Sequence, residues 1–163
     1  MTKNSLEKTL LILRSEIAKN DIHCIRIKES IDHLERIMPL SVEKINNFNY
    51  EEISSFALLT ECFIKLQDSI GEKVFLHLLT ILRERTLGKS FIDLLNKLEQ
   101  IEILESVSYW DKMRKVRNNL THEYPNSPEI TIQGLKDAIF YAQELCNYWE
   151  KLKKIILQRI TSA

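Results

Sequence analysis

Glycine and proline are scarce in this sequence, with three residues of each among 163. Because these two residues supply much of the turn chemistry that a many-stranded sheet needs, their scarcity argues against a β-rich fold. Leu, Ile, Glu and Lys, which favour helices, fill the long segments between them. The composition therefore predicts an all-α protein, and the length suits one domain that spans residues 1–163.

Net charge, cysteine pairs and long apolar runs are missing as well. Lys plus Arg and Asp plus Glu each number 23, so the chain has no overall positive charge to drive non-specific binding of nucleic acid. Its three cysteines, Cys24, Cys62 and Cys146, are far apart, which predicts small buried side chains rather than disulfides or a zinc site. The N-terminal segment lacks the apolar region of a signal peptide, and no run approaches the length of a membrane span. We therefore expect a cytoplasmic protein that does not cross a membrane.

Apolar residues recur at intervals of three and four over residues 6–38. This spacing predicts one long amphipathic helix that bends near Asn20 and Asp21, where the pattern fails, and stops before Pro39.

A second long helix is expected after Asn49, because Glu52 three residues later completes the pattern of a capping box. Its apolar spacing includes Ile53 and continues to about Arg85, with Gly71 as the weak point. Further helical segments are expected at about residues 91–100, 107–123 and 128–156. Long helices joined by short loops pack as antiparallel neighbours, so we predict an up-and-down bundle of four long helices and a short one.

The stretch VRNNLTHEYP (residues 116–125) gathers polar residues where a helix approaches Pro125. On a helical projection, Arg117 lies between Trp110 and the apolar stripe, where a charge is costly unless a carboxylate, a ligand or a partner surface pairs with it. His122 lies about 140° further around the helix. The two side chains can act on one phosphate if the arginine reaches round, or if a second subunit closes a cleft over the helix.

A purely structural interpretation is open at this point. Arg117 would then form an ion pair with an acid such as Asp68 or Glu61, and His122 would suit the negative end of the helix dipole. The other three histidines are far apart and lack the spacing of metal ligands, so we expect no metal site.

The same stretch resembles the R-x4-H-x-Y motif of HEPN proteins, in particular the HepT-like toxins encoded beside small MNT nucleotidyltransferases. Arg117, Asn118, His122 and Tyr124 match the arginine, the polar residue after it, the histidine and the tyrosine of that motif. The segments KLQDSIG and FIDLLNKLE precede the motif in the order found in this group. The resemblance implies a HEPN-like bundle that acts as a homodimer and as a metal-independent endoribonuclease with no cofactor.

These residue types suit cleavage of RNA through its own 2′-hydroxyl group. His122 can carry a proton near neutral pH, and Arg117 can donate two parallel hydrogen bonds to the developing phosphorane. Asn118 would orient the phosphate or the histidine, and Asp68 would pair with Arg117 beside the groove. A two-fold dimer would bring both arginines and both histidines into one groove.

The resemblance also implies how such a toxin is controlled. In a type VII-like HEPN/MNT pair, the nucleotidyltransferase antitoxin transfers AMP to the motif tyrosine, here Tyr124, which Pro125 biases out of regular helix. The attached phosphate would pair with Arg117 and block the groove. The alternative function is a non-catalytic partner of a nucleotidyltransferase, in which the same groove binds a nucleotide or a protein segment.

Overall fold

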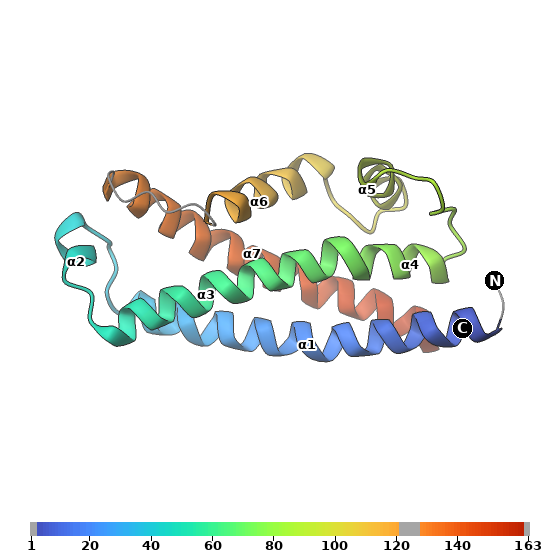
Figure 1. Ribbon diagram of the computed structural model, residues 1–163, viewed down its shortest axis with the longest axis horizontal. Helices are drawn as coiled ribbons and strands as arrows, with labels where there is room; N and C mark the ends of the chain where they lie inside the picture. The colour runs from blue at the N-terminus through green and yellow to red at the C-terminus, as the bar shows by residue number, and fades with distance from the viewer. Residues whose placement is uncertain (1–2, 121–127, 162–163) are drawn as a thin grey trace.

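The computed structural model describes residues 3–120 and 128–161, which form helices joined by turns and loops and include no β-strand (Figure 1). In chain order the helices are α1 (Lys3–Glu35), α2 (Val42–Asn46), α3 (Tyr50–Ser69), the π-helical turn η1 (Ile70–Val74), α4 (Phe75–Ile81), α5 (Phe91–Gln100), α6 (Val107–Leu120) and α7 (Pro128–Thr161). The predicted all-α class is confirmed for this part of the chain.

Four helical rods make up the bundle: α1, the continuous segment of α3, η1 and α4 (hereafter the rod), α6, and α7. Successive members run in opposite directions in Figure 1. Helix α1 packs against α3 and α7, and α6 packs against the same two helices. This order agrees with the predicted up-and-down bundle, although α6 is described over only 14 residues.

Side-chain caps set where α2 and α3 begin. The predicted capping box of α3 is confirmed, since Glu52 N donates to Asn49 Oδ1 at 2.9 Å and Asn49 N donates to Glu52 Oε2 at 2.8 Å. Helix α2 was not predicted. Its N-cap is Ser41, whose hydroxyl accepts from Lys44 N at 3.2 Å, and its five residues are too few to show helical periodicity.

Helix α1 continues through Asn20 and Asp21, so the bend predicted there does not interrupt it. Asn20 is fully buried, while the carboxylate of Asp21 accepts hydrogen bonds from Trp149 Nε1 at 2.8 Å and Lys153 Nζ at 2.9 Å. The apolar spacing fails here because polar side chains face the interior and α7, and not because the helix ends.

Apolar side chains from all four rods form one continuous core, in which Trp110 and Trp149 are the largest fully buried residues. All three cysteines are free and buried, as predicted. Ile53 is exposed, so its predicted place on the core side of α3 is wrong; one turn later, Phe56 faces the core. No helix in residues 3–120 and 128–161 is long and apolar enough to cross a membrane.

The rod formed by α3, η1 and α4 changes its helical geometry at the predicted weak point, Gly71, which lies within η1. Phe75 N donates to Ile70 O, five residues earlier, which is the hydrogen bond of a π-helix. A Cβ atom on Gly71 would lie 3.3 Å from Cζ2 of Trp110, so glycine permits the close approach of α6 to this turn.

Candidate functional site

The candidate site is an ion pair between the last turn of α6 and the last turn of α3. Arg117 donates from Nε to Asp68 Oδ1 at 3.2 Å and from Nη2 to Asp68 Oδ2 at 2.7 Å. This is the bidentate arrangement in which arginine binds carboxylates and phosphates most selectively. The side chains are 28% and 39% exposed, respectively, so the pair lies at the surface of the bundle, within reach of solvent.

The remaining edge of the guanidinium group points toward the end of α6. Arg117 Nη1 donates to Oδ1 of Asn118 at 3.3 Å, and Asn118 is exposed. The predicted role of Asn118, to orient a phosphate or the histidine, stays a prediction, and its contact with Arg117 places it beside the guanidinium group. Asn118 and Asp68 therefore hold the guanidinium plane from two edges.

Glu61 was the other acid considered as a partner for Arg117. It pairs instead with Lys65, one turn later on the same helix, and its side chain is 59% exposed. Of the two acids, the structure thus places Asp68 beside the arginine.

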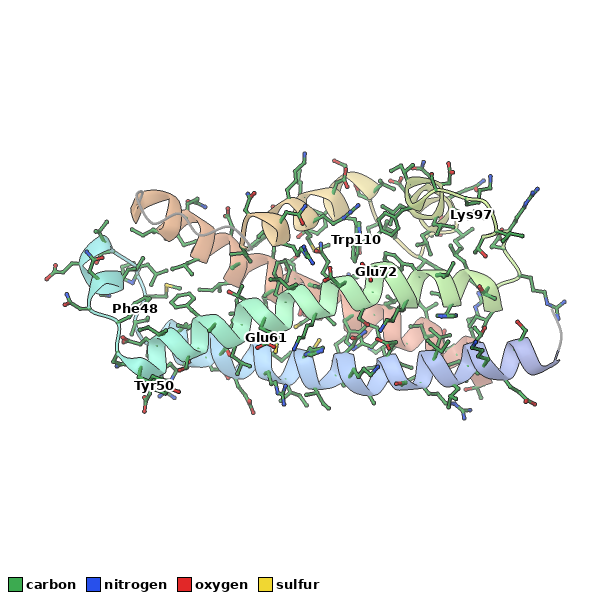
Figure 2. All side chains as sticks on the ribbon, viewed as in Figure 1. Phe48, Tyr50, Glu61, Glu72, Lys97 and Trp110 are labelled. Atoms are coloured by element: carbon green, nitrogen blue, oxygen red, sulfur yellow. The ribbon has the colours of Figure 1, made fainter. Side chains whose placement is uncertain are left out.

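Aromatic packing fixes the position of α6 along the rod of α3, η1 and α4. Trp110, two turns before Arg117, lies between α6 and the rod in Figure 2, with its ring 4.9 Å from that of Phe75. Arg114, also on α6, stacks over the ring of Phe91 at 4.9 Å, a cation–π contact that joins α6 to α5. These contacts fix the axial register that brings Arg117 level with Asp68.

A buried carboxylate of α1 contacts the same last turn of α3, on the side opposite to α6. Glu16 of α1 has a side chain only 5% exposed and accepts hydrogen bonds from Ser69 Oγ at 2.8 Å, Lys19 Nζ at 3.0 Å and Lys73 Nζ at 3.4 Å. Burial alone would raise the pKa of Glu16, but the hydrogen bonds from Lys19 and Ser69 and the charge of Lys73 outweigh it and lower the pKa below its usual value.

Sequence reasoning did not single out Glu16, although the pattern held a signal. It occupies a position in the buried row of α1 that comprises Leu13, Glu16, Asn20, Cys24 and Ile27. An acid within such a three-and-four spacing is expected to have partners on the facing helix, because an unpaired buried carboxylate is costly.

His122 and Tyr124 lie outside the described residues, so their roles remain predictions from the sequence. The described part of α6 ends at Leu120, two residues before His122. The histidines on other helices are elsewhere: His23 and His77 are half-buried, and burial lowers the pKa of each. Among the described residues, no group of three or more His, Cys, Asp or Glu side chains is placed to hold a metal ion.

The chain was compared with protein-family models, curated proteins and solved structures, and none of the three comparisons gave a match.

Proposed function

We propose that the chain is a metal-independent endoribonuclease of the HepT-like HEPN type, with Arg117 and His122 as its catalytic residues. The observation that carries this proposal is the bidentate, partly exposed pair of Arg117 and Asp68, in which Arg117 is the arginine of the motif, five residues before His122. An arginine held in a fixed plane at the surface is suited to bind a pair of oxygens on one atom, such as the two non-bridging oxygens of a phosphodiester.

The reaction needs no group beyond those of the motif. The 2′-oxygen of RNA attacks the adjacent phosphorus, the bond from phosphorus to the 5′-oxygen breaks, and a 2′,3′-cyclic phosphate and a 5′-hydroxyl result. One histidine takes the proton of the 2′-hydroxyl, and a second supplies a proton to the leaving 5′-oxygen. A two-fold dimer would provide both, one His122 from each chain.

Arg117 would stabilise the charge that develops on the phosphorane oxygens. Arginine has five N–H groups, and contacts with other described residues use Nε, Nη1 and Nη2 once each. The described part of the chain thus leaves two N–H groups for a phosphate. Asp68 would keep the guanidinium plane in place while these groups bind the phosphate.

The test is cleavage of RNA by the purified chain. Arg117→Ala and His122→Ala should each lower the rate about a hundredfold or more, because each removes either the charge stabiliser or the proton carrier. Arg117→Lys is the matched control for charge: it keeps the positive charge but loses the bidentate geometry, so it should also be impaired. Cleavage should survive EDTA and leave a 2′,3′-cyclic phosphate.

The same measurement separates this proposal from the alternative of a non-catalytic binding partner. Undiminished cleavage by both alanine variants, or loss of cleavage in EDTA, would contradict the proposed mechanism. A folded wild-type chain that binds RNA or nucleotide without cutting would favour the binding function, in which the Arg117–Asp68 pair is a recognition element.

We also propose that an MNT-type nucleotidyltransferase controls the chain through Tyr124. Its phenolic oxygen would attack the α-phosphorus of ATP, releasing pyrophosphate and leaving AMP on the tyrosine. Co-expression with such an enzyme should then add mass in steps of one AMP to the wild type but not to Tyr124→Phe, with loss of ribonuclease activity in step with the modification. Neutralisation of an unmodified chain would mean that the partner acts by binding alone.

A further inference from the structure

We infer that Glu16 is a positioning residue for the candidate site: it holds the turn of the rod that presents Asp68 to Arg117. The consequence for catalysis rests on the proposed function, whereas the geometric part of the inference rests on the structure alone. Glu16 is on α1, whereas Arg117 is on α6, and the rod of α3, η1 and α4 lies between these two helices (Figure 1). Both the rod and α7 contact these two helices, but it is the rod that carries hydrogen-bond partners of both Glu16 and Arg117.

The connection through the rod is short. Asp68 and Ser69 are consecutive residues at the end of α3, and their side chains reach opposite neighbours. Asp68 accepts both hydrogen bonds from Arg117, and Ser69 Oγ donates to Glu16 Oε2 at 2.8 Å. Because the two residues share one peptide unit, a rotation of this turn that breaks the Ser69 bond also moves the Asp68 carboxylate.

The π-helical turn lies at the junction that Glu16 contacts. In a continuous α-helix, the buried residues of α4 would fix the rotation of the α3 end through regular hydrogen bonds. Here η1 intervenes directly after Ser69, and a π turn inserts an extra residue that changes the rotational phase of the two halves. Packing of α4 alone therefore does not determine the direction in which Asp68 points.

Glu16 spans this change of geometry. Its carboxylate binds Ser69, the last residue of α3, and also Lys73, which lies within η1. Its third partner, Lys19, is on α1 itself, so that hydrogen bond does not join α1 to the rod. One buried carboxylate thus fastens both sides of the junction to α1, while Gly71 packs against Trp110 on the other side.

This arrangement provides a matched pair of variants. Lys73→Met and Lys19→Met each remove one ammonium group from the same carboxylate, and both lysines are half-exposed, so both variants should fold. Lys73→Met removes one of the two hydrogen bonds that join the rod to Glu16, whereas Lys19→Met leaves both in place. Glu16→Gln keeps the shape of the side chain but removes its charge.

The readout is the NMR signal of the Arg117 Nε–H group, which donates directly to Asp68, assigned by its disappearance in Arg117→Lys. In Lys73→Met and Glu16→Gln, exchange of this proton with water should accelerate about threefold or more, since a hydrogen bond to a charged group slows exchange about tenfold or more when intact. In Lys19→Met, exchange should match the wild type. The measurement needs no RNA.

Unchanged exchange in both Lys73→Met and Glu16→Gln would overturn the inference, as would equal acceleration in Lys19→Met, which would indicate an effect of charge at Glu16 alone. If the wild type cleaves RNA, Lys73→Met should lower kcat while KM changes little, because the arginine is still present but less well held. If the wild type does not cleave RNA, the proposed function fails while the Arg117 signal still decides this inference.

Discussion

Within residues 3–120 and 128–161, two residues other than glycine adopt a left-handed backbone, Arg83 with φ 61° and Glu102 with φ 59°. Glu102 follows the end of α5, and the next amide, Ile103 N, donates to Leu98 O at 2.9 Å and closes the helix. Helix ends of this type favour glycine at the left-handed position, because a Cβ atom there crowds the neighbouring carbonyl oxygen. The sequence therefore retains local strain at two helix ends.

Glu102→Gly should raise the free energy of unfolding by roughly 0.5–1 kcal/mol, because relief of the strain exceeds the extra entropy that glycine gives the unfolded chain. Glu99→Gly is the matched control, since the same change one turn earlier within α5 should lower the stability by about 1 kcal/mol. Urea denaturation of the three proteins measures both effects. A Glu102→Gly chain less stable than the wild type would show that the carboxylate makes contacts worth more than the strain.

At the residue scale, the sequence identified which side chains need partners but not all of the partners. The helical projection placed Arg117 at the margin of an apolar stripe, and it named Asp68 and Glu61 as candidate acids. The choice between them depends on the axial register of α6 on α3, which Trp110 and Gly71 set by contact between distant parts of the chain. Spacing along one helix carries no information about that register.

At the scale of elements, the two helical glycines have opposite surroundings. A Cβ atom on Gly71 would lie 3.3 Å from Trp110 and 3.6 Å from Phe91, whereas one on Gly134, within α7, would meet no atom within 4 Å. Trp110 is fully buried and also packs against Phe75, so it has little room to move.

Gly71→Ala should therefore lower the free energy of unfolding by roughly 1–2 kcal/mol, because overpacking outweighs the gain in helix propensity. Gly134→Ala should raise it by about 0.5–1 kcal/mol, because that helix gains propensity without a clash. Thermal denaturation followed by circular dichroism compares the two variants directly. Stabilisation by both changes would mean that the contact between α6 and η1 is looser than the structure indicates.

The elements themselves were predictable where a strong local rule applied. The capping box at Asn49 and the long apolar spacing of α1 and α7 identified those helices correctly. Gly71 marked the weak point of the second rod, but its π geometry was not predicted, because a single extra residue does not disturb an apolar spacing enough to be recognised. Helix α2 was missed because a five-residue helix depends on its cap rather than on periodicity.

At the scale of the whole molecule, the topology could be predicted from the order of long helices and short connections. The properties of each face of the surface could not. A formal net charge of zero gave no indication of which face meets a partner. In the structure, an aromatic row crosses from α6 to α7. Tyr109 of α6 lies 6.0 Å from Tyr141 of α7, and Tyr141 makes an edge contact at 5.1 Å with Phe140, which is 56% exposed.

A large exposed aromatic residue next to the helix that carries Arg117 is a suitable anchor for the second chain that the proposed groove requires. Light scattering at micromolar concentration should then give twice the 19.2 kDa of one chain. Phe140→Asp should shift the protein toward the monomer, because it would bury an unpaired carboxylate in the interface. Leu157→Asp is the matched control: Leu157 is also an exposed apolar residue of α7 but lies more than four turns further along the helix, so this variant should stay dimeric.

A wild-type chain that is monomeric under these conditions would count against a groove built from two chains, and cleavage by such a monomer would require one His122 to serve as both base and acid.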